Sequence, residues 1–107
     1  MSATYLVVSE TAERDIDDIA MYIAADNVQS ALRFEAELNT ALARLQAFPA
    51  MGRVIVGSPA LRVMRVSSRF RHYLIVYRWD DPTVEILRLL HDAMDIRARL
   101  DLPDADR

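Results

Sequence analysis

The sequence is poor in the residues that cross-link or sharply turn a chain. It has 107 residues, with no cysteine, two glycines and four prolines. The absence of cysteine excludes disulfide scaffolds, cysteine-based zinc sites and thiol catalysis. So few glycines and prolines disfavour an all-β sandwich, which needs many tight turns. No apolar run approaches the ~18 residues of a membrane span, and the N-terminus lacks a signal-peptide pattern, so we expect a cytoplasmic protein.

Lysine is absent as well, so all thirteen basic residues are arginine, against sixteen acidic residues. The charges are unevenly distributed: residues 1–52 carry a net −5, whereas residues 53–99 carry a net +4. This asymmetry indicates two chemically different surfaces. The basic half suits contact with a nucleic acid, or with a protein that handles one. The alternative is ordinary solvated charge on strands.

Two amphipathic helices are predicted in the first half. Residues 4–8 are β-branched and aromatic, typical of a strand, and Ser9 is placed to cap a helix after it. Apolar residues recur at helical spacing over 12–23 and, after a break at 26–27, over 31–48. Two such helices with a short break predict a helical hairpin. On the polar side of the first helix stand acids that we expect to face solvent: Asp15, Asp17 and Asp18.

The second half predicts three strands, at residues 61–66, 70–79 and 84–90, the last two joined by an Asp-Asp-Pro turn. A weak helical pattern follows over 92–102. We therefore predict an α+β fold: an N-terminal strand, a helical hairpin, then a three-stranded antiparallel meander that completes a small sheet, and a short C-terminal helix. At ~150 residues per domain, residues 1–107 form a single domain, and residues 103–107 are expected to fray.

The strand at 70–79 is apolar on both faces, and one helical hairpin covers only one face of a sheet. By alternation, one face carries Tyr73, Ile75, Tyr77 and Trp79. The other carries Phe70, Leu74 and Val76. We therefore expect an apolar face that the hairpin leaves uncovered, to be covered by the C-terminal segment, a second copy of the chain or another protein. An exposed apolar groove of that kind usually marks a binding site.

Motifs for cofactor and metal chemistry are missing. Gly52 and Gly57 have the spacing of a phosphate-binding loop, but Ser58 stands where that loop requires lysine. The two histidines, His72 and His91, lack metal-binding spacing. We expect neither a cofactor nor a metal.

One enzymatic alternative uses a histidine with strand arginines. Cleaving RNA needs a base for the 2′-hydroxyl, cations for the phosphorane charge and an acid for the leaving oxygen. His91 would act as base or acid, with Arg65 and Arg78 as the cations. Because successive strand residues point to opposite faces, the strand arginines cannot all converge.

Several short motifs follow one another in a specific order. They are A-E-R-D-I at 12–16, P-x-x-G-R at 49–53, Y-L-I-V-Y-R at 73–78 and L-R-x-x-H at 87–91. With this order and spacing over residues 4–96, the chain resembles the RelE/ParE toxin superfamily, and its ParE branch more closely. One departure is Met94, which precedes Asp95 where ParE relatives often carry an arginine. The lack of lysine is a departure from RelE-type nucleases and favours the ParE branch.

The resemblance implies the toxin of a type II toxin–antitoxin pair, a non-catalytic inhibitor of DNA gyrase that blocks DNA replication. A small, partly disordered ParD-like antitoxin would neutralise it by wrapping a flexible segment around it, which suits an uncovered apolar face. A homodimer or a heterotetramer with the antitoxin is implied, without membrane contact or direct DNA binding. The alternatives are a RelE-like ribosome-dependent mRNA endoribonuclease, metal-independent and using the residues named above, or a toxin-fold protein without a target.

The resemblance and the surface pattern together suggest two sets of contact residues. Target contacts are expected in the basic half and the C-terminal segment: Arg78, Arg88, His91 and Arg97. Antitoxin contacts are expected on the hairpin and the apolar strand face: Phe34, Leu38, Tyr73, Ile75, Tyr77 and Trp79. Structural roles are the alternative, such as pairing of Arg88 with Glu85, or Arg53 holding its loop.

Overall fold

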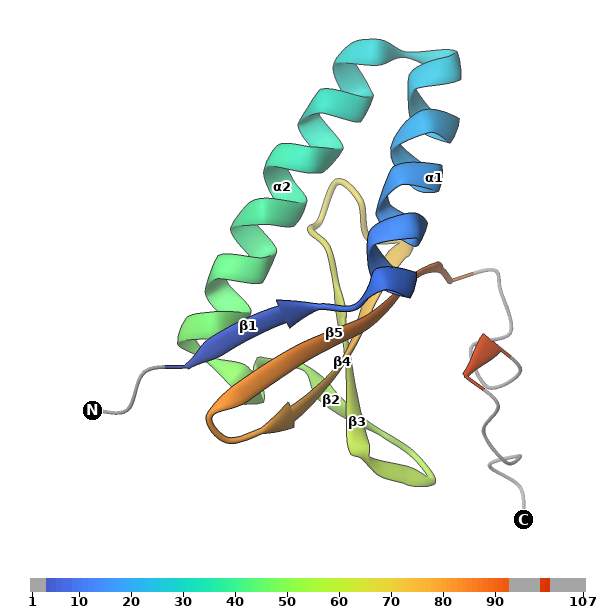
Figure 1. Cartoon of the computed structure of the whole chain (residues 1–107). Coiled ribbons are helices and arrows are strands. Elements are labelled where there is room, and N and C mark those ends of the chain that lie inside the picture. Colours follow the sequence, from blue (N-terminus) through green and yellow to red (C-terminus); the bar gives the residue numbers. More distant parts are fainter. Residues whose placement is uncertain (1–3, 93–98, 101–107) are drawn as a thin grey trace.

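The computed structural model describes residues 4–92 and 99–100. Its elements are β1 (Tyr5–Val8), α1 (Glu10–Asp26), α2 (Val28–Ala47), the 3₁₀ turn η1 (Pro49–Met51), β2 (Arg53–Ile55), β3 (Ser58–Arg65), β4 (Tyr73–Asp80) and β5 (Thr83–His91). The predicted α+β fold is confirmed, with two helices side by side and one sheet (Figure 1). The helix predicted over 92–102 falls mostly outside the described residues, and the tail at 103–107 wholly so.

Side-chain caps set the start of both helices. The hydroxyl of Ser9 accepts from the N–H of Ala12 at 3.0 Å at the start of α1. Asn27 is the single residue between the helices, and its Oδ1 accepts from the N–H of Ser30 at 2.9 Å. Each cap satisfies a backbone donor that the first helical turn leaves without a partner. Because the break is one residue long, α1 and α2 turn back on each other as the predicted hairpin.

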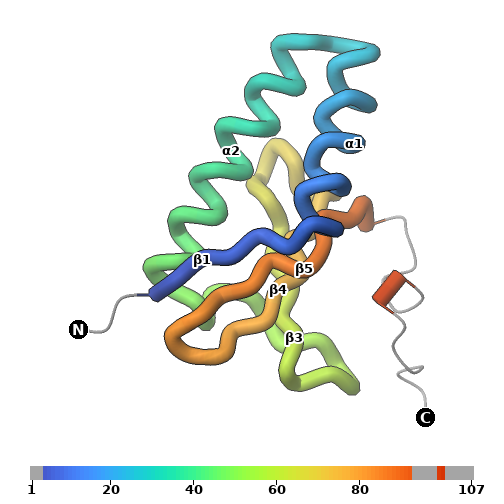
Figure 2. The backbone as a smooth tube through the Cα atoms, viewed as in Figure 1, coloured from blue at the N-terminus to red at the C-terminus, as the bar shows by residue number. Residues whose placement is uncertain are grey.

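The five strands form one sheet in the order β1-β5-β4-β3-β2. β1 runs parallel to β5, and all other neighbours are antiparallel. The first and last strands of the described chain therefore lie side by side (Figure 2). β2 adds a short edge strand to the predicted meander. Gly57 turns the chain between β2 and β3 at a φ of 86°, a conformation that residues with a Cβ rarely adopt.

The hairpin packs on one face of the sheet and forms the larger core. Phe34 of α2 meets Phe70 and Tyr73 edge-on, with ring centroids 5.3 and 5.4 Å apart. Phe70 lies on this side because it precedes β4, in a turn where its N–H bonds to Ser67 Oγ at 3.1 Å. Strict strand alternation had placed Phe70 on the opposite face, which is wrong. The other large buried side chains of this core include Leu38, Leu45, Ile75, Tyr77, Ile86 and Leu89.

The second face of the sheet, which the hairpin leaves uncovered, carries a smaller buried cluster of its own. Val76 and Leu90 are 0% and 2% exposed, and Val63 and Leu74 are buried beside them. Leu100 packs against this cluster. Of the three covers considered from the sequence, the described residues show a contribution from the C-terminal segment.

Candidate interaction surfaces

Asp15 of α1 and Arg88 of β5 form a bidentate ion pair beyond the end of β1. Arg88 Nε and Nη2 donate to the two carboxylate oxygens of Asp15 at 2.7 and 3.1 Å. Asp15 Oδ2 also accepts from the backbone N–H of Leu89 at 3.0 Å. The bond to Asp15 raises the pKa of Arg88 despite partial burial. The expectation that Asp15 faces solvent is wrong, because α1 places its carboxylate against β5 just past the end of β1.

Arg78 lies on the opposite part of the sheet from the other predicted nuclease residues. Its Nη2 donates to Glu85 Oε1 at 2.6 Å, across the pair that Arg78 makes with Glu85 in the β4–β5 register. His91 stands opposite Tyr73, at the other end of the same two strands, and Arg65 stands opposite Leu74. The sheet thus brings His91 and Arg65 to one end and Arg78 to the other. It does not assemble the three groups into one site.

A carboxylate between two imidazoles occupies the end of β5. Asp92 Oδ2 lies 2.9 Å from His72 Nδ1, and Asp92 Oδ1 lies 3.5 Å from His91 Nδ1. The two rings stack with centroids 6.0 Å apart. The hydrogen bond from His72, followed by the charges of His72, His91 and Arg65, lowers the pKa of Asp92. Sequence reasoning missed His72, although its position at the start of the strongest strand could have placed it opposite the end of β5.

The described residues contain no group of three or more potential ligands able to hold a metal ion. Around Asp92, the contact with His72 is a hydrogen bond and the longer contact with His91 is an ion-pair contact.

Four of the six residues predicted to contact an antitoxin belong to the core. Phe34, Leu38, Ile75 and Tyr77 are 0–2% exposed, because the hairpin covers this strand face. They have no free surface to offer a partner in this conformation. Tyr73 is half-buried, and Trp79 is 38% exposed with the guanidinium of Arg62 at 6.0 Å from its ring.

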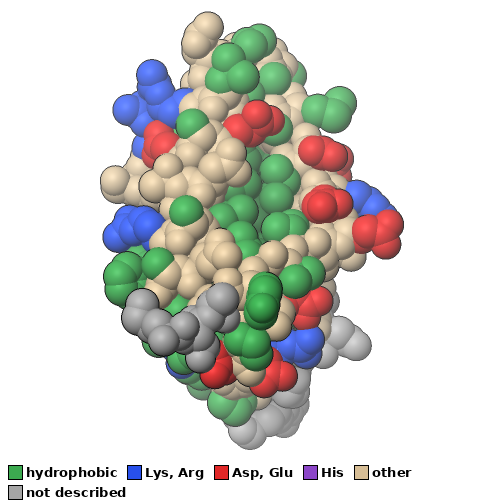
Figure 3. Space-filling view, turned by 60° about the vertical axis from the view of Figure 1, so that its left-hand side comes forward, with side chains coloured by type: hydrophobic (Ala, Val, Ile, Leu, Met, Phe, Trp, Pro, Cys, Tyr) green, Lys and Arg blue, Asp and Glu red, His purple; other side chains and the backbone are tan. Residues whose placement is uncertain are grey.

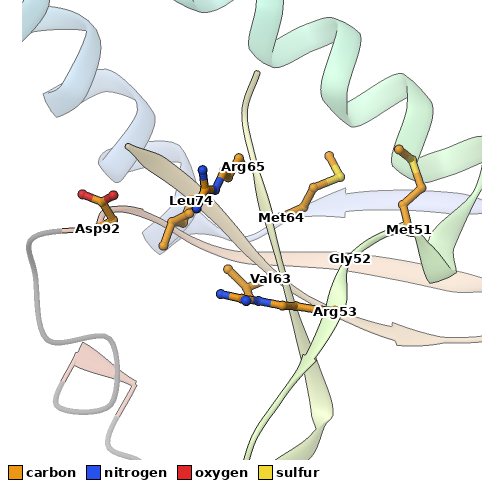
Figure 4. Close-up of a pocket in the computed structure, with 8 residues that line it drawn as sticks. All are labelled: Met51, Gly52, Arg53, Val63, Met64, Arg65, Leu74 and Asp92. Carbon is orange, nitrogen blue, oxygen red and sulfur yellow. The ribbon is translucent and has the colours of Figure 1, made fainter. Parts of the chain in front are cut away.

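Two hollows meet at the outer edge of β3. The first, of about 490 Å³, lies on the side of the second core cluster (Figure 4). The second, of about 520 Å³, lies on the side of α2. Both are lined by Met51, Met64 and Arg65. The first is completed by Gly52, Arg53, Val63, Leu74 and Asp92, and the second by Ala41, Arg44, Val66, Ser67, Ser68 and Arg71.

The hairpin presents a further apolar surface. Figure 3 shows hydrophobic side chains gathered in a hollow, with acidic side chains along its right-hand rim. A hollow of about 520 Å³ lies at the hairpin tip, between Tyr22 and Ser30. Large hydrophobic side chains that are more than half exposed on the hairpin are Met21, Tyr22, Val28 and Leu32. The hairpin thus exposes large apolar side chains to solvent, whereas the strand residues that face the hairpin are buried.

Residues 6–96 match the family model described as the ParE toxin of the type II toxin–antitoxin system parDE. The chain belongs to the ParE toxin family. A solved structure titled "Chromosomal ParDE TA system from P. aeruginosa" shares 20% sequence identity with a TM-score of 0.68, covering 83% of this chain and 96% of that one. At this identity the likeness shows a shared fold. None of the curated proteins compared with the chain matches it.

The predicted target residues of this ParE-family chain differ in how freely they face solvent. The side chains of Arg78 and His91 are 52% and 39% exposed, whereas that of Arg88 is 22% exposed and bound to Asp15. Arg97 lies outside the described residues. The P-x-x-G-R loop is held by Arg62, whose Nη1 donates to the carbonyl of Gly52 at 2.8 Å. Among the described helices, none combines the length and the hydropathy needed to cross a bilayer.

Proposed function

We propose that this ParE-family chain inhibits DNA gyrase, and thereby DNA replication, as the non-catalytic toxin of a type II toxin–antitoxin pair in the cytoplasm. The observation that carries the proposal is the family match over residues 6–96, which includes both helices and all of the described strands except the first residue of β1. The fold shared with the P. aeruginosa structure supports it.

The separation of the candidate nuclease side chains in the sheet supports inhibition without catalysis. His91 and Arg65 lie at one end of the sheet, and Arg78 lies at the other, bonded to Glu85. RNA cleavage requires its base, acid and cations around one phosphate. The proposed activity therefore rests on binding, with Arg78 and His91 as the exposed contacts and Arg97 as a further one.

Neutralisation is proposed to come from a ParD-like antitoxin that contacts the hairpin and the exposed parts of the sheet. The exposed side chains of Tyr22, Val28 and Leu32 on the hairpin suit an amphipathic partner segment, and Trp79 suits a contact on the sheet. The complex is expected to be a heterotetramer or to contain a toxin dimer.

A supercoiling assay with purified gyrase tests the toxin activity. We expect the wild-type chain to inhibit supercoiling, and Arg78→Ala to need about tenfold more protein for the same inhibition, as for loss of one important interface residue. The matched control is Arg14→Ala, since Arg14 also pairs with a glutamate on the surface, 3.8 Å away on α1. We expect this control to inhibit like the wild type. Full supercoiling activity at every concentration of the folded chain would refute the proposal that gyrase is the target.

Expression of the chain in a bacterial host distinguishes a gyrase inhibitor from the two alternatives, an endoribonuclease and a toxin-fold protein without a target. Filamentous cells with DNA-damage signalling are expected, together with rescue by co-expression of a cognate antitoxin. Rapid loss of translation with cut messages, abolished by His91→Ala, would instead establish the endoribonuclease. Normal growth at every expression level would establish a toxin-fold protein without a target.

A further inference from the structure

Four exposed arginines line the two hollows at the outer edge of β3. They come from four segments of the chain: Arg44 from α2, Arg53 from β2, Arg65 from β3 and Arg71 from the turn before β4. Figure 4 shows two of them, Arg53 and Arg65, at the first hollow. Within the described part of the chain, none of the four forms an ion pair or a side-chain hydrogen bond. Their guanidinium donors are therefore available to a ligand.

Other arginines of the chain are bound within the fold. Ion pairs with acidic side chains hold Arg14, Arg69, Arg78 and Arg88. Arg62 donates to the carbonyl of Gly52 at 2.8 Å, so it is this arginine, and not Arg53, that holds the loop before β2. The fold thus leaves a group of four unpaired arginines at one edge of the sheet, without a structural role that would explain them.

The hollows offer these arginines little compensating negative charge. Asp92 is the one acid among the residues that line them, and its Oδ2 lies 2.9 Å from His72 Nδ1. The hydroxyl-bearing lining residues are Ser67 and Ser68. Guanidinium groups and hydroxyls are the donors with which proteins bind phosphate oxygens. The charge and the donor types together suit a ligand that carries several phosphates.

The lining residues favour recognition of a backbone over recognition of bases. Single-stranded nucleic acids are held largely by stacking their bases on aromatic side chains. Of the described residues that line the two hollows, none is aromatic. Contacts to phosphates alone are independent of sequence and suit a double helix, whose bases are stacked inside. A chain that inhibits gyrase works beside such a helix, because supercoiling is a change made to duplex DNA.

We propose that Arg44, Arg53, Arg65 and Arg71 bind the phosphodiester backbone of duplex DNA at the outer edge of β3. This inference rests on the proposed function, since that function brings the chain next to DNA. It departs from the resemblance, which implies no direct DNA binding by the toxin. The contact adds affinity for a target that holds DNA, without adding a preference for a DNA sequence. It also gives a role to the basic half of a chain whose net charge is −3.

Fluorescence anisotropy of a short labelled DNA duplex, titrated with the full chain at several salt concentrations, tests the proposal. Each phosphate contact contributes about −0.9 to the slope of log affinity against log salt, so four contacts predict a slope of about −3.6. Between about 50 and 200 mM salt, this slope corresponds to roughly a hundredfold loss of affinity. Absence of binding at about 50 mM salt would overturn the inference, and so would tighter binding of single-stranded RNA than of the duplex.

Single substitutions show whether the contact lies at this edge. We expect Arg65→Gln and Arg71→Gln each to weaken duplex binding and to make the salt slope shallower by about one. The matched control is Arg33→Gln, which removes the same charge from another exposed arginine of α2, away from the two hollows. We expect this control to bind like the wild type. If all three variants lose affinity equally while melting at the wild-type temperature, binding follows net charge alone and the site is refuted.

The supercoiling assay distinguishes failure of this inference from failure of the proposed function. A wild-type chain that inhibits gyrase but does not bind the duplex refutes the DNA contact and leaves the gyrase proposal intact. A wild-type chain that binds the duplex with the expected salt slope, yet leaves supercoiling unchanged, refutes the gyrase proposal and supports the arginine site.

Discussion

The buried hydroxyl of Tyr77 accepts a hydrogen bond from the N–H of Gly52 at 2.8 Å. The same hydroxyl donates to the carbonyl of Pro49 at 2.7 Å. Burial, the largest cause, raises the pKa of Tyr77, so the phenol stays protonated and keeps both bonds. One side chain in the middle of the sheet thereby fixes the loop that leads from α2 into β2. This loop carries Met51, which lines both hollows at the outer edge of β3.

Tyr77→Phe is expected to lower the free energy of unfolding by about 1–3 kcal/mol. The substitution removes only the hydroxyl, but it leaves the N–H of Gly52 and the carbonyl of Pro49 without their partner in a largely buried place. Urea unfolding monitored by circular dichroism measures the change. Tyr5→Phe is the matched control, because Tyr5 is 60% exposed, and it should change stability by less than about 0.5 kcal/mol. Equal stability of the Tyr77 variant and the wild type would contradict the bridging role.

Gly52→Ala is expected to destabilise the fold by about 1–3 kcal/mol through crowding. A Cβ at this position would lie 2.6 Å from the Tyr77 hydroxyl oxygen and 2.7 Å from its ring carbon Cε1. Backbone strain is not the cause, because the φ of Gly52 is −72°, which any residue adopts. Thermal unfolding against the neighbouring exposed variant Met51→Ala measures the effect. A melting temperature for Gly52→Ala at or above that of the control would show that the tyrosine can move aside freely.

Asp15→Ala should cost about 2–3 kcal/mol of stability, because it removes the acceptor of two guanidinium bonds and one backbone bond. A double-mutant cycle with Arg88→Ala should return a coupling of at least about 1 kcal/mol. Asp17→Ala serves as the control, since Asp17 lies on the exposed side of the same helix. If the stability losses of the two single variants simply add up in the double variant, the ion pair contributes no coupling energy to the fold.

Acid should weaken the contact between Asp92 and His72. Because the pKa of Asp92 is lowered in the folded chain, folding favours its charged form. The contribution of this carboxylate to stability is therefore complete above the unfolded pKa of ~3.9. That contribution is lost as pH falls through the lower folded value. Unfolding measured between about pH 5 and pH 2.5 should therefore show a steeper loss of stability for the wild type than for Asp92→Asn. Parallel curves would show that the carboxylate gains nothing from its imidazole neighbours.

The sequence predicts the elements well and the solvent-facing surfaces poorly. Hydrophobic periodicity and capping located both helices and the β4–β5 hairpin, because those signals are local. The burial of Tyr77 and the pairing of Asp15 with Arg88 depend on contacts 25 and 73 residues apart in the chain, which periodicity does not report. Alternation correctly grouped Ile75 with Tyr77, but it could not tell which face the hairpin would cover. It also failed at Phe70, where a turn replaces the strand.

The placement of β5 has a consequence for the order in which the protein matures. The last strand among the described residues, β5, lies in the interior of the sheet between β1 and β4 and is hydrogen-bonded to both of them. Until Thr83–His91 has emerged, β1 has no neighbour, and α1 lacks the anchor that Arg88 provides. A truncated product that stops before this strand should remain open and degradable. Ribosomes that stall before β5 would thus release incomplete chains, and only chains that include β5 would form the complete sheet.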